Sequence, residues 1–448
     1  MRILLIIEPS DRTYITMSNM PPLGVLSICA YLREKGLHVD LLTRNVRAGR
    51  KPIPSGYDVY GLSINIANLE NSMRTIDLVK EKDPGCVVAV GGPICTSDPN
   101  RFREKNGVDL IFIGEAEESF YDFIINGTGP ELKGVHFRDN QGQWIFNGPH
   151  DLIEDLDRLP FPAWDMLNPG EMTVCPRKRR PITGIITSRG CPSHCIFCSK
   201  TMGNKWRARS PEDVVDEIQW HMEELGSKEI CLWDDNFSLD LVRAERICDL
   251  VVERGLRVSL QFPNGLRADR LTEELIRKMK RAGVWYLAVA PETGSERTLK
   301  RIGKGLSLES VENAVGLCRK YGISIALFFM IGFPWETADD IEKTIRFARR
   351  LGGDLSTFSR VVPLKGTRLF DMIERQGGFR SERIIQTHYA QEQTFINPHL
   401  SDREISKYIK KANRRCYLNQ KAIKNLLSAF SFRDLARMVM FALRTRNI

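Results

Sequence analysis

Short apolar runs alternate with amphipathic stretches over two long parts of this chain, and this alternation restricts its fold more than any other feature. In the first part the apolar runs are Ile3–Ile7, Val39–Leu42, Val59–Ile66, Val87–Val90 and Leu110–Ile113, and helical patterns such as Gly24–Lys35 and Leu69–Lys80 lie between them. Strands that alternate with helices form a parallel sheet with helices on both faces. We therefore predict a doubly wound α/β domain over residues 1–148, ending in a hairpin over residues 134–148 that turns at Asn140-Gln141-Gly142.

The second part, residues 182–367, repeats a strand–helix unit about six times. The expected strands are Ile182–Ser188, Glu229–Trp233, Val258–Phe262, Tyr286–Ala290, Ile323–Ile331 and Thr357–Val362. Ser210-Pro211, Thr272-Glu273 and Thr337-Ala338 are typical helix starts. We predict a partial, TIM-type (β/α)6 barrel over residues 181–385, with its site at the carboxyl ends of the strands.

Two further segments complete the predicted organisation. Residues 149–180 contain Leu159-Pro160-Phe161-Pro162 and read as a linker, in which the basic run Arg177–Arg180 is interpreted as a solvated turn. Residues 386–448 read as a helical C-terminal region. Its last part, Ala422–Arg446, is basic and amphipathic. Such a helix can lie on a membrane surface, but we expect it to pack on its own domain.

Charge and composition exclude several classes of protein. The 448 residues carry a formal net charge of +9. Lys and Arg are spread along the chain among Asp and Glu, so we expect no nucleic-acid partner. No apolar stretch reaches the length of a membrane span, and the five apolar residues after Arg2 are too few for a signal sequence, so we expect a cytoplasmic protein. The 11 cysteines of such a chain are not expected to form a disulfide framework.

Cys191, Cys195 and Cys198 form the pattern C-x3-C-x2-C on the loop after the first barrel strand. Thiolates bind soft metals and iron–sulfur clusters. Three ligands on one loop can hold three irons of a [4Fe–4S] cube and leave the fourth iron open. The alternatives are a structural zinc site, which needs four ligands, and three unrelated buried cysteines, which the loop residues Gly190 and Pro192 disfavour.

The segment Arg189-Gly190-Cys191-Pro192-Ser193-His194-Cys195-Ile196-Phe197-Cys198 resembles the signature of the radical S-adenosylmethionine (SAM) enzymes, with Phe197 at its aromatic place. The resemblance implies a [4Fe–4S] cluster whose open iron binds SAM. It also implies SAM contacts at the strand ends. The residues at the matching places are Asp234, Asp235, Arg267, Glu292, Ile331 and Gly332. Taken singly, Asp235 could also be a helix cap, Glu292 a surface acid and Arg267 an ion-pair partner.

The first domain resembles the flavodoxin-like cobalamin (B12) binding domains that are fused to radical SAM barrels. The resembling loops contribute Pro22, Gly24, Ser63, Gly91, Gly92, Pro93, Gly114, Glu115 and Glu117. No His stands in an Asp-x-His-x-x-Gly pattern, so cobalamin is expected without a His on cobalt. Ser63, Gly91 and Gly92 would hold its nucleotide tail, although Asn65 stands where Leu is usual. A generic nucleotide- or flavin-binding domain is the alternative.

Together these resemblances imply a cobalamin-dependent radical SAM methyltransferase. Such enzymes use methylcobalamin and a 5′-deoxyadenosyl radical to methylate an unactivated carbon, and they take electrons from a donor of the ferredoxin or flavodoxin type. The chain's compact length resembles that of archaeal enzymes that methylate a glutamine of methyl-coenzyme M reductase. We therefore expect a protein or peptide side chain as substrate, ahead of a small molecule. Oxidative cyclisation, modification of lipids or tetrapyrroles, and a non-catalytic cobalamin-responsive protein are the alternatives.

Overall fold

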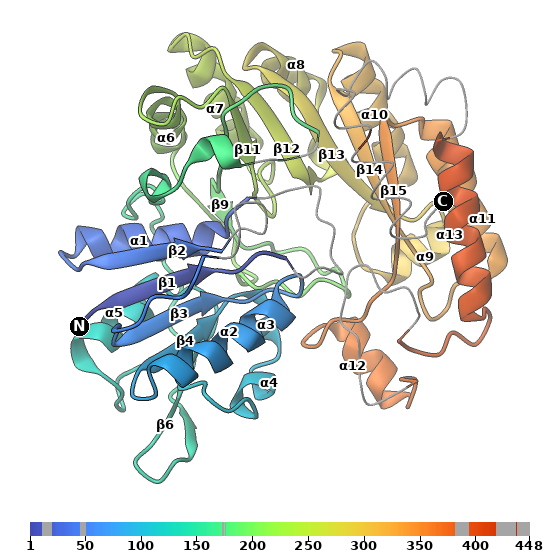
Figure 1. The fold of residues 1–448 in the computed structure, drawn as a ribbon. Coiled ribbons are helices and arrows are strands. Elements are labelled where there is room, and N and C mark those ends of the chain that lie inside the picture. Colours follow the sequence, from blue (N-terminus) through green and yellow to red (C-terminus); the bar gives the residue numbers. More distant parts are fainter. Residues whose placement is uncertain are drawn as a thin grey trace. The chain divides into compact units, whose positions relative to one another are not determined.

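The computed structural model describes residues 1–10, 20–44, 51–172, 174, 176–380, 394–417 and 436. The chain divides into two compact units, the first of residues 1–168 with 200–203 and the second of residues 169–199 with 204–448 (Figure 1). The basic helix expected over Ala422–Arg446 falls, except for Ala436, outside the described residues. None of the described helices is long and apolar enough to cross a membrane.

A seven-stranded sheet of order β2-β1-β3-β4-β5-β6-β7 forms the centre of the first unit. Its strands are β1 Ile3–Ile7, β2 Val39–Thr43, β3 Val59–Ser63, β4 Val87–Gly91, β5 Leu110–Phe112, β6 Val135–Arg138 and β7 Trp144–Phe146. The first five are parallel, and β6 and β7 form the expected antiparallel hairpin. This is the predicted doubly wound, flavodoxin-like order.

Helices cover both faces of this sheet (Figure 1). They are α1 Leu23–Glu34, α2 Leu69–Lys82, α3 Pro93–Ser97, α4 Asn100–Arg103 and α5 Glu117–Asn126, with a 3-10 turn at Trp164–Met166. Successive residues of β1 point to opposite faces, so Ile3, Leu5 and Ile7 pack toward α1 and α5 whereas Leu4 and Ile6 pack toward α2 and α3. Burial on both sides explains why the strands read as continuous apolar runs.

The second unit is built on six parallel strands in the order β15-β14-β13-β12-β11-β8, which confirms the predicted partial barrel. These strands are β8 Ile182–Ile185, β11 Glu229–Leu232, β12 Ser259–Leu266, β13 Val284–Glu292, β14 Ser324–Ile331 and β15 Leu355–Arg360. A separate antiparallel pair is formed by β9 Ser188–Arg189 and β10 Arg207–Ala208. The expected strand Ile182–Ser188 is therefore interrupted after Ile185.

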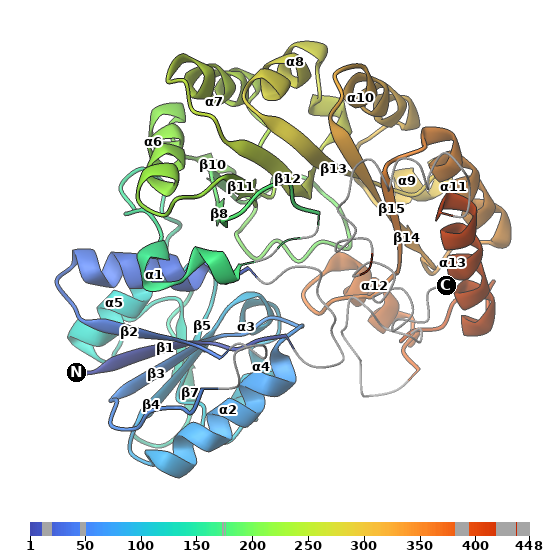
Figure 2. The same ribbon diagram turned by 45° about the horizontal axis from the view of Figure 1, so that its top comes forward.

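Helices line the outer face of the curved sheet (Figure 2). They are α6 Pro211–Glu223, α7 Leu241–Glu253, α8 Glu273–Arg281, α10 Leu308–Lys320 and α11 Ala338–Leu351, and α13 Asp402–Tyr417 packs on β15 and α11. The short helices α9 Glu296–Arg301 and α12 Arg368–Arg375 pack instead in a separate apolar cluster with Phe333 and Trp335, and 3-10 turns lie at Pro169–Glu171 and Ala268–Arg270. The three predicted helix starts are confirmed. Ser210 and Thr272 accept from the backbone of α6 and α8, and Thr337 forms a capping box with Asp340.

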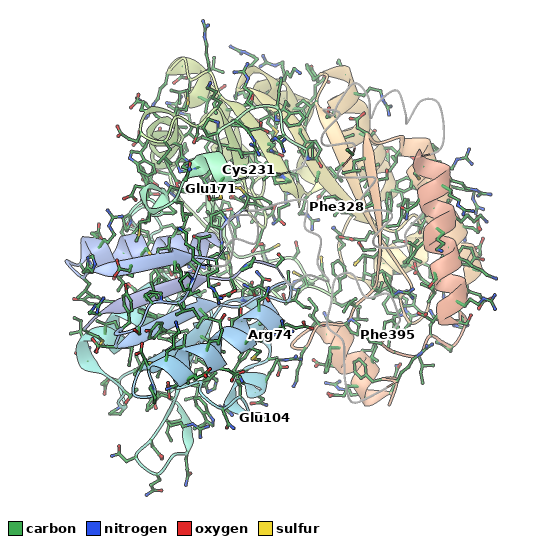
Figure 3. The ribbon with its side chains drawn as sticks, in the orientation of Figure 1. Arg74, Glu104, Glu171, Cys231, Phe328 and Phe395 are labelled. Carbon is green, nitrogen blue, oxygen red and sulfur yellow. The ribbon has the colours of Figure 1, made fainter. Side chains whose placement is uncertain are left out.

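Strand alternation separates the two faces of this sheet. Outward residues such as Ile230, Leu287 and Phe329 join the main core under the helices. The opposite face carries a smaller cluster that includes Tyr286 and Ala326, with Phe328 packed against it (Figure 3). The carboxyl ends of the strands are thus held by a continuous core on one side, which gives the loops at that edge a rigid support.

The amino-terminal edge of the second unit is tied together by Glu229. Its side chain is fully buried, and its carboxylate accepts from the backbone nitrogens of Lys178 and Arg179, from Gln261 Nε2 at 2.8 Å and from Trp285 Nε1 at 3.0 Å. Burial raises the pKa of this carboxyl group, while the four donors oppose the rise. One carboxylate therefore links the segment before β8 to β11, β12 and β13.

Replacing Glu229 by Gln should destabilise this edge, because an amide nitrogen would then face two donors. We expect a loss of about 2–4 kcal/mol, measured by chemical denaturation followed through tryptophan fluorescence. Glu224→Gln is the matched control, since Glu224 is exposed at the end of α6. Equal denaturation midpoints for the two variants would contradict the anchoring role.

Candidate functional site

The loop that carries the three cysteines begins where the buried carboxylate of Asp234 interrupts the first strand of the second unit. That carboxylate accepts from Thr187 N at 2.7 Å, Thr187 Oγ1 at 2.6 Å and Ser188 Oγ at 2.6 Å. The backbone at Thr187 is thereby turned away from the strand ladder, and β9 then pairs with β10 at the base of the loop. Asp234 thus supports the loop with three of the hydrogen bonds that its carboxylate can accept, and the SAM contact expected of it stays a prediction.

The cysteine loop is fixed from behind at Ile196. Its backbone N–H donates to Ile302 O at 3.0 Å, and its carbonyl accepts from Leu369 N at 2.9 Å. Phe197 lies 6.3 Å from Phe333, measured between ring centroids, and both Ile196 and Phe197 pack against one apolar cluster. The members of that cluster are Leu299, Ile302, Phe333, Trp335, Val361, Leu369, Ile373 and Phe395. Phe395 comes from the segment before α13 and is labelled in Figure 3.

The thiols themselves suit an iron–sulfur cluster. None of the three is joined in a disulfide, and Cys191 and Cys195 are half-buried whereas Cys198 is exposed. Burial raises the pKa of Cys195, and the charges of Cys198 and Cys191 raise it further, which places the three sulfurs within electrostatic reach of one another. In the described part of the chain, no three His, Cys, Asp or Glu side chains converge closely enough to hold one metal ion. Three thiols on one loop match the three protein ligands of a [4Fe–4S] cube with an open fourth iron.

Asp235 differs from its neighbour Asp234. Its side chain is exposed and makes no hydrogen bond with the described residues, yet enough protein surrounds it that burial, followed by the Asp234 charge, raises its pKa. Of the two adjacent acids, Asp235 is therefore the one whose carboxylate is available to a cation such as the SAM ammonium group.

Glu292 ends β13 with a backbone φ of +66°, a region that side chains other than glycine rarely adopt. The residue is buried, and its carboxylate pairs with the Lys304 ammonium, whose side chain is 12% exposed. Strained residues of this kind cost about 1–3 kcal/mol and cluster at functional sites. The structure therefore places Glu292 at the carboxyl edge, as predicted, but adds Lys304 as its partner.

All three side-chain nitrogens of Arg267 donate hydrogen bonds to protein acceptors. Nε and Nη2 bind the Asp269 carboxylate at 3.0 Å each, and Nη1 donates to Ser193 Oγ at 3.0 Å and to Lys304 O at 2.9 Å. The SAM carboxylate, the contact predicted for Arg267, would have to replace one of these partners, and that contact stays a prediction. The observed geometry of Arg267 braces Ser193 of the cysteine loop against the loop that carries Lys304.

The end of β14 presents backbone more than side chain. Ile331 is fully buried under the helices, and its carbonyl accepts from Val361 N, so contact with a ligand would involve Gly332. The Glu336 carboxylate accepts from Gly332 N at 2.8 Å and Phe333 N at 3.1 Å, and burial raises its pKa to about 7. Asn397, which is 64 residues away in sequence, donates from Nδ2 to Phe333 O at 2.8 Å.

Sequence reasoning gave no role to Lys304, Ser193, Glu336 or Asn397. The only local signal for Lys304 is its place between two glycines, Gly303 and Gly305. Glu336 comes four residues after Gly332, which was predicted to contact SAM, but Glu336 itself was given no role. Asn397 is distant in sequence, so only the folded chain shows it beside this loop.

The carboxyl edge of the first unit brings five of the predicted cobalamin residues together. Ser63 and Gly91 are register partners on β3 and β4, and Pro93 starts α3 directly after Gly92. Gly92 has a φ of +100°, and a Cβ there would lie 2.8 Å from Ile64 O and 3.0 Å from Ser63 Oγ. Gly114 N donates to Thr96 Oγ1 at 2.9 Å. Glycine at position 92 lets the start of α3 pack directly against the end of β3, which fixes the shape of this edge.

The remaining predicted cobalamin residues differ in what they contact. The buried Glu117 carboxylate accepts from Ser27 Oγ at 2.7 Å and so joins α5 to α1. Glu115 Oε2 accepts from Ile153 N at 3.2 Å. Both acids therefore contribute to packing within the unit, and the cobalamin contacts expected of them stay predictions. Pro22 precedes α1 as its N-cap, and a Cβ on Gly24 would meet nothing within 4 Å, so the start of this helix is open.

Comparisons with protein families assign both units. Residues 185–348 match the radical SAM superfamily, and residues 17–124 match the B12 binding domain. An uncharacterised methyltransferase from Pyrococcus horikoshii is 30% identical over 454 residues, covering 96% of this chain and 96% of the relative. The anaerobic magnesium-protoporphyrin IX monomethyl ester cyclase of Rubrivivax gelatinosus is 24% identical, covering 79% of this chain and 66% of the relative.

Solved structures share the fold. The radical SAM methyltransferase TsrM from Kitasatospora setae, with cobalamin and a [4Fe–4S] cluster bound, has a TM-score of 0.69 at 16% identity and covers 97% of this chain and 90% of its own. The cobalamin-dependent radical enzyme OxsB, with aqua-cobalamin and SAM bound, has a TM-score of 0.74 at 17% identity and covers 99% of this chain and 72% of its own. With these matches to both units, the chain belongs to the cobalamin-dependent radical SAM methyltransferases, a family whose cofactors are a [4Fe–4S] cluster, SAM and cobalamin.

Proposed function

We propose that this protein methylates an unactivated carbon of a peptide or protein side chain, with a glutamine such as that of methyl-coenzyme M reductase as the leading candidate. The observation that carries the proposal is the three-cysteine loop, held by backbone hydrogen bonds at the carboxyl edge of a radical SAM sheet. When bound, the cluster and SAM supply a 5′-deoxyadenosyl radical, and cobalamin supplies the methyl group. A ferredoxin- or flavodoxin-type protein would deliver the electrons.

The proposed residue roles combine the family resemblance with the positions of the side chains. Cys191, Cys195 and Cys198 would hold the cluster, while the exposed carboxylate of Asp235 would bind the SAM ammonium group. The remaining SAM residues are Glu292, beside the ribose and methionine part, and Gly332, whose backbone is held by Glu336 beside the adenine. In the first unit, Ser63, Gly91 and Gly92 form the cradle for the nucleotide tail of cobalamin.

One observation supports a side-chain substrate. On the inner face of β14 and β15, the half-buried side chains Phe328, Met330, Thr357 and Ser359 are apolar or neutral. An uncharged surface of this kind suits an amide-bearing side chain better than an anionic one.

Oxidative cyclisation of a tetrapyrrole is the second candidate, because the Rubrivivax relative is named as such a cyclase. The same cofactors serve both reactions, so the products decide between them. In the cyclase case SAM is consumed at the cluster without methylation of cobalamin.

Replacing Cys195 by Ala should abolish formation of 5′-deoxyadenosine, because one ligand of the cluster is lost. The measurement uses anaerobically reconstituted protein with cobalamin, methyl-labelled SAM and a strong reductant, and quantifies 5′-deoxyadenosine and S-adenosylhomocysteine together. Cys416→Ala, at a half-buried cysteine outside the loop, should behave as wild type. Deoxyadenosine from the wild type without label on cobalamin would exclude methyl transfer and favour cyclisation.

Replacing Gly92 by Ala should weaken cobalamin binding, because the added Cβ meets Ile64 O at 2.8 Å in a backbone conformation that Ala disfavours. We expect at least tenfold less retained cobalamin, measured by its visible absorbance after gel filtration. Gly129→Ala is the matched control, since a Cβ there meets nothing within 4 Å. Full retention by Gly92→Ala, with circular dichroism unchanged, would argue against a cradle at this edge.

The pH dependence of the free energy of unfolding should reveal the titration of the Glu336 carboxyl group. Its pKa in the folded protein is raised to about 7 by burial, above the ordinary value of 4.5, so the folded state binds a proton that the unfolded state releases between these values. Stability is therefore lost as the pH rises from about 4.5 to 7, by roughly 3 kcal/mol for this group. Glu336→Gln keeps an acceptor for Gly332 and should flatten that slope, whereas Glu309→Gln, at an exposed helix start, should not.

A further inference from the structure

Lys304 stands out among the residues that the sequence left unassigned. It lies on the short loop between α9 and α10, and its ammonium group is enclosed by protein, with 12% of the side chain exposed. The ammonium donates to Ala290 O at 2.6 Å and pairs with the Glu292 carboxylate. These two contacts span the turn at the end of β13, where Glu292 has its positive φ. A side chain that bridges both ends of a strained turn holds that turn in place.

The same loop is built against the cysteine loop. Ile302 O accepts from Ile196 N at 3.0 Å, and a Cβ on Gly303, which has a φ of +69°, would lie 2.9 Å from His194 O. Arg267 joins Ser193 Oγ to Lys304 O across the same contact. Only a residue without a side chain fits at Gly303, so the two loops are in direct backbone contact. Lys304 is therefore positioned relative to the cysteines and not merely near them.

The contacts of this loop place the Lys304 charge beside the cluster ligand Cys195. The two contacted residues, His194 and Ile196, are the immediate neighbours of Cys195 in the cysteine loop. The Lys304 side chain is mostly shielded from water, so its charge is only weakly screened by salt.

We propose that Lys304 is a positioning residue with two effects: it fixes the Glu292 carboxylate for SAM, and it holds a positive charge beside the cluster that Cys195 ligates. Adding an electron to a cluster adds negative charge, so a nearby cation stabilises the reduced state and raises the reduction potential. The inference rests on the proposed function, because it requires a cluster at the three cysteines. It goes beyond that function by naming the residue that sets how easily the cluster is reduced.

The test compares Lys304→Met and Lys304→Arg with the wild type and with Lys300→Met, which removes the same charge from the exposed face of α9 four residues away. The full-length chain is reconstituted anaerobically with iron and sulfide, and its iron content is measured first. The midpoint potential of the cluster is then determined by a redox titration followed by electron paramagnetic resonance without SAM, and SAM affinity is measured separately at equilibrium.

Lys304→Met should lower the midpoint potential and weaken SAM binding roughly tenfold, the effect of losing one charge-assisted hydrogen bond. Lys304→Arg should keep the potential near that of the wild type, because the charge remains. A wild-type potential in Lys304→Met would overturn the proposal, as would an equal shift in Lys300→Met or a Lys304→Arg potential as low as that of Lys304→Met. If the wild type itself fails to bind iron, the proposed function is overturned. The measurement of iron content detects this outcome before any variant is compared.

Discussion

The buried carboxylate of Asp234 is the interaction on which the reactive edge of the radical SAM unit depends. It takes three hydrogen bonds from Thr187 and Ser188, and it thereby decides where the first strand ends and where the cysteine loop starts. A buried carboxylate without donors is costly, and so are donors without a carboxylate, so this loop origin is firmly specified. The backbone contacts of Ile196 and the apolar cluster behind Phe197 then fix the rest of the loop.

Several charged residues at both carboxyl edges turn out to hold the protein together. Asp234, Arg267 and Glu117 all occupy positions where a ligand contact was expected, and all three direct their polar atoms at other parts of the same unit. The groups that remain as candidates for ligand contact are fewer: the exposed carboxylate of Asp235, the half-buried loop at Gly92 and three thiols. This division suits an enzyme in which the cofactors perform the chemistry and the protein supplies orientation.

The sequence was sufficient for the architecture because both sheets are covered by helices in a regular way. Apolar runs located the strands, and side chains such as Ser210 and Thr272 marked helix starts by the local hydrogen bonds they make. Side-chain direction was harder to predict. Asp234 and Asp235 are adjacent and chemically identical, and only the position of Thr187, 47 residues earlier, separates their roles. Lys304 and Asn397 escaped notice because their partners lie in segments that only folding brings together.

The anchoring of Glu229 bears on how such two-part chains could arise. Because its carboxylate holds the backbone of Lys178 and Arg179, the entry of the chain into the first barrel strand is set within the radical SAM unit itself. Sequence upstream of that point can change in length or be exchanged for another module without shifting the register of β8. A barrel that fixes its own entry point in this way is suited to gene fusion, and a cobalamin-binding module could be joined to it without redesign of the reactive edge at the opposite ends of the strands.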